Sequence, residues 1–237
     1  MYTKFGPPGQ RFIAVIEAYL DESGTDATAP IVGVGGFFGS HQQWSIFLDR
    51  WEPVLLGNKF HAKDSTRMFP ILVDAIKKAK LEGILVTVAK DIYKKTATPQ
   101  MKSVIGNEYS VCAFQCALQI CDEVDNCPTS FVIERGQPNE DFVKRILESF
   151  IGDHKYHVAA VATAAKEDFV QLHTGDFLSH IASTHDILWM KRLFNAGRLK
   201  HLHVTEQQIA ETCPKVKELL GKARWLRNKA KDSLVSV

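Results

Sequence analysis

The residues of this chain best suited to chemistry are three carboxylates that stand far apart in the sequence: Asp21, Glu134 and Asp176. Carboxylate oxygens bind hard divalent cations such as Mg²⁺ and Mn²⁺. Two such ions, about 3.5–4 Å apart, promote hydrolysis of a phosphodiester bond by a metal-bound water, so no nucleophilic side chain is needed. The three acids therefore predict a phosphodiester hydrolase if the fold brings them together.

Asp21 stands at the end of a predicted strand. Residues 15–20 are apolar except for Glu17, and Ser23 with Gly24 is typical of a turn. Open α/β sheets hold their ligands at the carboxyl ends of strands. Because neighbouring strand residues point to opposite faces, we expect Asp21 to face the site and Glu22 either to turn aside or to lie around the metal ligands. A plain polar turn is the alternative, since Asp, Ser and Gly all favour turns.

The other two acids have comparable settings. Glu134 directly follows a predicted strand, and Asp176 lies on a predicted helix that places His173 and His180 on the same face. An acid in so apolar a segment is rare unless it is paired or bound to metal, which favours a functional role over a surface one. The neighbouring Gly175 indicates close approach of a strand or a ligand, because Gly costs about 1 kcal/mol in a helix relative to Ala.

The segment 60–64 carries a histidine, a lysine and an aspartate within five positions. It lies outside any periodic element, and loops with such groups are common sites of function. His61 is suited to orienting substrate or assisting proton transfer near neutral pH, with Asp64 beside it. A solvated loop whose histidine bonds to the backbone is the alternative.

Composition sets the broad class of the protein. The 237 residues are 45% hydrophobic, which is enough for one sizeable core. No apolar run can span a bilayer, and residues 1–11 are predicted to be a flexible lead-in without the apolar core of a signal peptide. Five cysteines, an odd number without an export signal, indicate a reducing compartment. We therefore expect a single cytoplasmic domain, with no membrane partner.

The net charge of +2 predicts no strong overall attraction to nucleic acid. Local basic groups are nevertheless candidates for contacts with phosphates, and a solvated surface is the alternative. Residues 205–232 form a predicted basic helical extension for which the same two interpretations hold. The candidate side chains are Lys63, Lys94, Lys95 and Arg135.

Strands alternate with helices along the chain, which indicates an α/β fold. The polar stretch 96–107 is predicted to be a loop, and Pro214 is expected to divide the C-terminal helical region. The first two strands can pair as a hairpin. Predicted strands are residues 15–20, 31–38, 83–90, 129–133 and 156–163, and predicted helices include 40–55, 69–80, 108–124 and 139–150.

Three motifs resemble those of the domain-of-unknown-function family thirty-eight-hundred, which is grouped with the ribonuclease H-like superfamily. Residues 19–24, Tyr-Leu-Asp-Glu-Ser-Gly, closely match the opening motif of the family, and residues 60–64 and 171–178 complete the resemblance. In the third motif Gly175 replaces the usual Ala, and Glu134 stands where the resemblance leads us to expect Asp. The resemblance implies a ribonuclease H-like mixed sheet of about five strands, flanked by helices, with extra C-terminal helices.

By this resemblance, Asp21, Glu134 and Asp176 are ligands of Mg²⁺ or Mn²⁺, and the protein is a metal-dependent nuclease that acts on nucleic acid. A catalytically silent binding or regulatory module on the same fold is one alternative. A small-molecule phosphoesterase is another, which the modest net charge favours slightly. The residues expected around the metal ligands are Glu22, His61, Asp64, His173 and His180.

Overall fold

The computed structural model describes residues 15–26, 28–125, 127–136, 139–153, 155–184 and 186–235. The predicted lead-in, residues 1–11, lies outside them. Within these residues every helix is too short or too polar to cross a membrane.

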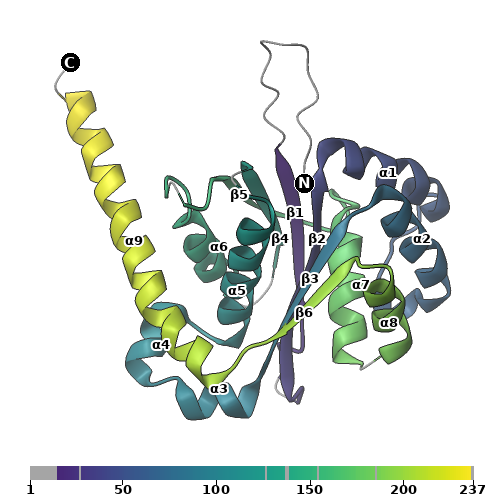
Figure 1. Cartoon of the computed structure of the whole chain (residues 1–237), viewed down its shortest axis with the longest axis horizontal. Helices are drawn as coiled ribbons and strands as arrows, with labels where there is room; N and C mark the ends of the chain where they lie inside the picture. The colour runs from purple at the N-terminus through teal and green to yellow at the C-terminus, as the bar shows by residue number, and fades with distance from the viewer. Residues whose placement is uncertain are drawn as a thin grey trace.

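In the described residues a six-stranded mixed sheet runs through the middle of the molecule, with helices on both faces (Figure 1). The strand order is β5-β4-β1-β2-β3-β6, and β2 alone runs against the other strands. The predicted α/β class with a mixed sheet is therefore confirmed, as is the hairpin of the first two strands. The strands are β1 (Ile16–Ser23), β2 (Ile31–Ser40), β3 (Glu82–Ala89), β4 (Thr129–Glu134), β5 (Val158–Ala164) and β6 (Leu199–His203).

The helices form a layer on each side of the sheet. One layer holds α1, α2, α7 and α8, and the other holds α3, α4, α5, α6 and α9 (Figure 1). Two short 3₁₀ helices, Ala62–Asp64 and Thr66–Met68, lie between α1 and α2. The bounds are α1 (His41–Leu55), α2 (Phe69–Ala79), α3 (Lys90–Thr96), α4 (Pro99–Ile105), α5 (Glu108–Glu123), α6 (Glu140–Glu148), α7 (Leu172–Ser183), α8 (Ile187–Asn195) and α9 (Glu206–Val235).

Alternation of side chains along β1 divides them between two hydrophobic cores. Ile16, Ala18 and Leu20 belong to the core on the α5 side, and Tyr19 belongs to the core on the α7 side. The same alternation, carried to the end of the strand, directs Asp21 toward α7. The sheet therefore presents this carboxylate to the helix that carries Asp176.

Helix α7 packs unusually close to the sheet because glycines face each other at the contact. A Cβ atom on Gly175 would lie 2.9 Å from the Cβ of Asp21 and 3.2 Å from the carbonyl oxygen of Gly35. A Cβ on Gly35 would lie 3.0 Å from Cγ of Leu178. The prediction that Gly175 marks close approach to a strand is confirmed.

Several predicted boundaries were wrong for identifiable reasons. β1 continues to Ser23 because its pairing with β2 continues to the Ser23–Gly33 pair, so the two acids lie inside the strand and not after it. The predicted loop 96–107 contains α4, since the Thr98 hydroxyl accepts a hydrogen bond from the Met101 backbone N–H and caps that helix.

The C-terminal part of the chain also differs from expectation. α9 continues through Pro214, because its buried residues Ile209, Val216 and Leu219 anchor the helix on both sides of the proline. Sequence patterning missed both α8 and the edge strand β6. β6 is half exposed and carries Lys and His among its apolar residues, so it lacks the apolar run of a central strand.

Candidate functional site

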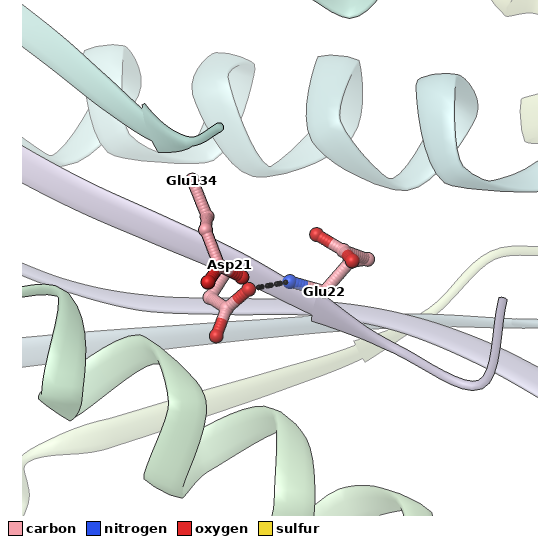
Figure 2. Close-up of side chains that lie close together, drawn as sticks. All are labelled: Asp21, Glu22 and Glu134. Atoms are coloured by element: carbon pink, nitrogen blue, oxygen red, sulfur yellow. Dashed lines mark hydrogen bonds between the residues drawn. The ribbon is translucent and has the colours of Figure 1, made fainter. Parts of the chain in front are cut away.

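Three neighbouring parallel strands end at the same edge of the sheet, and each brings a charged group there. β1 brings Asp21, β4 ends with Glu134, and Lys166 follows β5 by two residues. The backbone register aligns the first two, because Leu20 pairs with Ile133 one position earlier. Asp21 and Glu134 therefore lie side by side (Figure 2).

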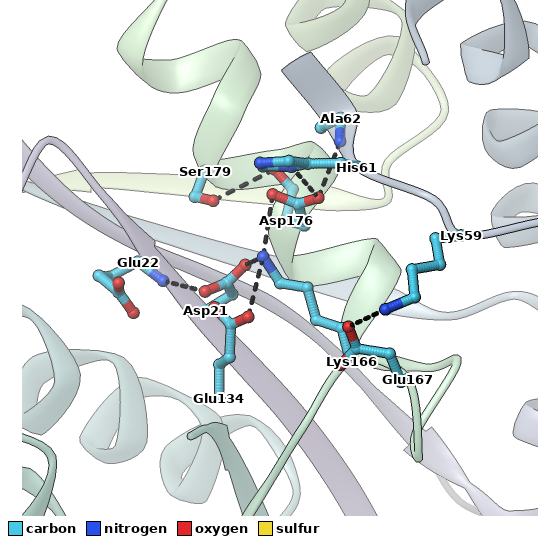
Figure 3. Close-up of polar contacts among 10 residues, drawn as sticks. All are labelled: Asp21, Glu22, Lys59, His61, Ala62, Glu134, Lys166, Glu167, Asp176 and Ser179. Carbon is cyan, nitrogen blue, oxygen red and sulfur yellow. Dashed lines mark hydrogen bonds and ion pairs between the residues drawn. The ribbon is translucent and has the colours of Figure 1, made fainter. Parts of the chain in front are cut away.

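The ammonium group of Lys166 is the point on which three carboxylates converge (Figure 3). Its Nζ lies 2.9 Å from Oδ2 of Asp21, 3.1 Å from Oε1 of Glu134 and 3.2 Å from Oδ1 of Asp176. The acids come from β1, β4 and α7, so the fold joins the three residues that the sequence separates. Asp21 and Asp176 are only 2% and 6% exposed.

Glu22 lies closer to the site than strand alternation predicts. Asp21, Glu22 and Glu134 each offer a carboxylate oxygen, and these oxygens lie within 4.8 Å of one another. The backbone N–H of Glu22 donates to Oδ1 of Asp21 at 2.8 Å (Figure 2). Glu22 is thus available as an oxygen ligand. Asp176 is linked to the other acids by an ion pair with the Lys166 ammonium.

Asp176 is held in place from the side opposite Lys166. Its Oδ2 accepts a hydrogen bond from the backbone N–H of Ala62 at 2.8 Å and lies 3.1 Å from Nδ1 of His61. The His61 side chain is 56% exposed, so it can exchange protons with solvent. Asp64 and Lys63 occupy the adjoining 3₁₀ turn, and both are exposed there.

Within the described residues, His173 makes no hydrogen bond with the acids. Its Nδ1 accepts a hydrogen bond from Nε1 of Trp51 at 3.1 Å, and its ring packs on Phe60. Burial lowers the pKa of His173 to about 4, so the ring is neutral. The ring of His180 packs against Phe69. A role of His173 and His180 around the metal ligands therefore stays a prediction.

The neutral state of His173 predicts a dependence of stability on pH. Between pH 6.5 and 4 the unfolded chain binds a proton that the folded chain excludes, so stability falls as pH falls through this window. Over this pH range the buried neutral His173 lowers the free energy of unfolding by about 3 kcal/mol. Urea unfolding from pH 4 to pH 7 should show a flatter profile for His173→Phe than for wild type. The exposed His41→Gln is the control, and equal slopes for wild type and His173→Phe would contradict the assignment.

If all its carboxylates were ionised, the acid cluster would carry more negative charge than Lys166 neutralises. Burial, together with a hydrogen bond to Glu134, raises the pKa of Asp21 well above its ordinary value. Burial and the charge of Glu134 raise the pKa of Glu22 to about 8. One ammonium faces four carboxylates, and Oε2 of Glu22 is buried without a hydrogen-bond partner in the described part of the chain. An all-oxygen set with surplus negative charge fits a hard divalent cation.

A cavity of about 620 Å³ adjoins the cluster. Its lining includes Glu134, Lys166, His61, Lys59 and Phe60. Lys59 pairs with Glu167 at 3.0 Å near this cavity (Figure 3). A substrate group in the cavity would therefore contact both the carboxylate cluster and a histidine.

Lys166 was missed in the sequence, and a role of the candidate basic groups in binding nucleic acid stays a prediction. The signal that could have found it is the rule that selected Asp21 and Glu134, because Lys166 also follows a strand. Arg135 donates to the carbonyl oxygen of Thr163, and Lys95 pairs with Glu206 of α9. Lys94 is exposed on α3.

Comparison with known proteins finds structural likeness without sequence likeness. No protein-family model and no curated protein matches the sequence, so membership of the domain-of-unknown-function family stays a prediction. The solved structures with likeness to this chain include ribonucleases H.

Three neighbours illustrate this likeness, each with a TM-score of 0.47. The complex of PCNA with ribonuclease HII from Archaeoglobus fulgidus is 15% identical, over 76% of this chain and 78% of that one. Ribonuclease H2 from Pyrococcus horikoshii is 12% identical, over 76% and 77%. Bst ribonuclease HIII in complex with Mn²⁺ is 11% identical, over 77% of this chain and 56% of that one.

Proposed function

We propose that this protein is a divalent-metal-dependent nuclease, in which Asp21, Glu134 and Asp176 hold Mg²⁺ or Mn²⁺ and Glu22 supplies a further oxygen. The observation that carries the proposal is the convergence of the first three carboxylates, from β1, β4 and α7, on a single cationic point. Oxygen ligands with surplus charge are the donor set that such ions select. The bound metal would supply a water nucleophile and neutralise charge on the phosphate.

The residues around the metal ligands have separate roles in this proposal. His61, bonded to Asp176 and open to solvent, moves a proton between substrate and water. The backbone N–H of Ala62 fixes the orientation of Asp176. The cavity of about 620 Å³ receives the part of the nucleic acid next to the scissile phosphate.

The proposal fits the cytoplasmic location that the cysteines predict. In the structure all five cysteines are free, and Cys112, Cys116, Cys121 and Cys213 are buried. A reducing compartment keeps such thiols in this form.

Metal removal tests the proposed function. Single-stranded DNA, single-stranded RNA, DNA duplex and DNA–RNA hybrid would be incubated with the protein and Mg²⁺ or Mn²⁺, with a chromogenic phosphodiester in parallel. We expect cleavage of at least one polynucleotide, its loss with EDTA, and its return when excess Mn²⁺ is added. Turnover of the chromogenic diester alone would instead identify a small-molecule phosphoesterase.

A catalytically silent module on the same fold is the second candidate, and one observation favours it. Lys166 already forms ion pairs with three of the acids, which makes a structural cluster possible without metal. Hydrolysis of neither class of substrate under any metal condition would support this module over the nuclease.

A further inference from the structure

Lys166 occupies the position that the proposed function assigns to a metal ion. Its Nζ contacts Oδ2 of Asp21, Oε1 of Glu134 and Oδ1 of Asp176 at 2.9–3.2 Å (Figure 3). The lysine side chain is only 17% exposed. An ammonium group this enclosed is held by its charged partners, because burial alone disfavours a charge.

An ammonium and a divalent ion cannot use these oxygens together. Mg²⁺ lies roughly 2.1 Å from its oxygen ligands. An ion bound to the oxygens of Asp21, Glu134 and Asp176 would therefore overlap the space of the Lys166 Nζ. The two cations would also repel each other strongly at such a separation. Metal entry at this point thus requires the lysine to leave.

The cavity beside Lys166 can receive the displaced side chain. The residue belongs to the turn between β5 and α7, outside any regular element, and it lines the cavity of about 620 Å³. The carbonyl oxygen of the preceding residue, Ala165, accepts hydrogen bonds from the backbone N–H groups of Asp168 and Phe169 at 3.1 and 3.2 Å. The backbone can therefore stay in place while rotation of the flexible four-carbon chain carries the ammonium toward His61 and Lys59.

We propose that Lys166 is an internal counter-ion that a divalent metal displaces, and that the displaced ammonium enters the adjoining cavity to bind the phosphodiester anion. This inference rests on the proposed function, since it takes the same carboxylates as metal ligands. In the metal-free protein Lys166 holds together acids that would otherwise repel one another. With metal bound, the same positive charge serves to position substrate.

The first test compares metal affinity by calorimetric titration with Mn²⁺ in wild type, Lys166→Met and Lys200→Met. Methionine keeps an unbranched side chain of similar length and removes the competing charge. We expect Lys166→Met to bind Mn²⁺ about tenfold more tightly or better, because the metal no longer displaces a cation. Lys200, which is exposed and paired with Glu123, is the matched control and should leave affinity unchanged.

The second test detects the displacement itself in the wild-type protein, so it does not depend on folding of the variant. An amine-reactive acylating reagent is applied with and without saturating Mn²⁺, and labelling of each lysine is measured by peptide mass spectrometry. The enclosed Lys166 should be protected without metal and become several-fold more reactive with it. Labelling of Lys200 should not change.

The outcomes separate this inference from the proposed function. If Mn²⁺ binds wild type and Lys166→Met equally, or saturates wild type while Lys166 stays protected, displacement is wrong and the nuclease proposal stands. If only Lys166→Met binds Mn²⁺, the lysine is a permanent replacement for the metal, which also overturns displacement. If neither protein binds Mn²⁺, both proposals fail.

Discussion

Replacing Asp21 with Asn is expected to lower metal-dependent phosphodiester hydrolysis on the order of 10³-fold. The substitution keeps the shape of the side chain and removes the charge of the least exposed acid in the cluster, which bonds to Lys166 and to the backbone of Glu22. Asp176→Asn should have an effect of the same order, because the Asp176 carboxylate, on α7, contacts the same Lys166 ammonium. Initial rates at saturating Mn²⁺ give the measurement.

The control for both variants is Asp49→Asn, an identical chemical change at an exposed position of α1. Its rate should equal that of wild type. Circular dichroism of each variant establishes that the fold is retained. Hydrolysis at the wild-type rate by folded Asp21→Asn and Asp176→Asn would show that these carboxylates do not form the catalytic site.

Replacing Gly175 with Ala is expected to destabilise the fold by about 1–3 kcal/mol. The added Cβ would lie 2.9 Å from Cβ and 3.0 Å from the backbone nitrogen of Asp21, so α7 must move away from the sheet. Backbone atoms of a paired strand cannot yield as a flexible side chain does. The same shift separates Asp176 from Asp21, and we expect weaker Mn²⁺ binding along with lower stability.

Gly221→Ala provides a matched comparison for this prediction. Gly221 lies in helix α9, and a Cβ there would meet nothing within 4 Å. Ala is the better helix former, so this substitution should stabilise the protein by up to about 1 kcal/mol. In urea denaturation we expect Gly175→Ala to lower the free energy of unfolding and Gly221→Ala to raise it. A Gly175→Ala protein as stable as wild type would mean that the close contact of α7 with the sheet is not required.

The central part of the fold was predictable because its signals are local. Apolar strands that end in acids, and amphipathic helices between them, identified most elements and the edge of the sheet where Asp21 and Glu134 lie. The peripheral elements carry weaker signals. β6 is a half-exposed edge strand, and α9 passes through a proline that its buried contacts outweigh.

The carboxylates of the candidate site were predicted from the sequence, and its lysine, Lys166, was not. Asp176 was selected because an acid is rare in an apolar helix, and the structure brings it to the same point as Asp21. Lys166 also follows a strand, yet its part in the site arises from the side-by-side ends of β1, β4 and β5, which the local pattern does not reveal. Glu22 was expected either to turn aside or to lie around the ligands, and its oxygen lies within 4.8 Å of those of Asp21 and Glu134.

The measurement that tests the central claim most directly is a calorimetric Mn²⁺ titration of wild type and of the double variant Asp21→Asn, Asp176→Asn. The account predicts binding in the micromolar-to-millimolar range for wild type, as is common for carboxylate sites, and loss of that binding in the folded double variant. Equal binding by both proteins would place the metal elsewhere. Absence of binding in wild type would contradict a metal centre formed by these carboxylates and favour the silent module.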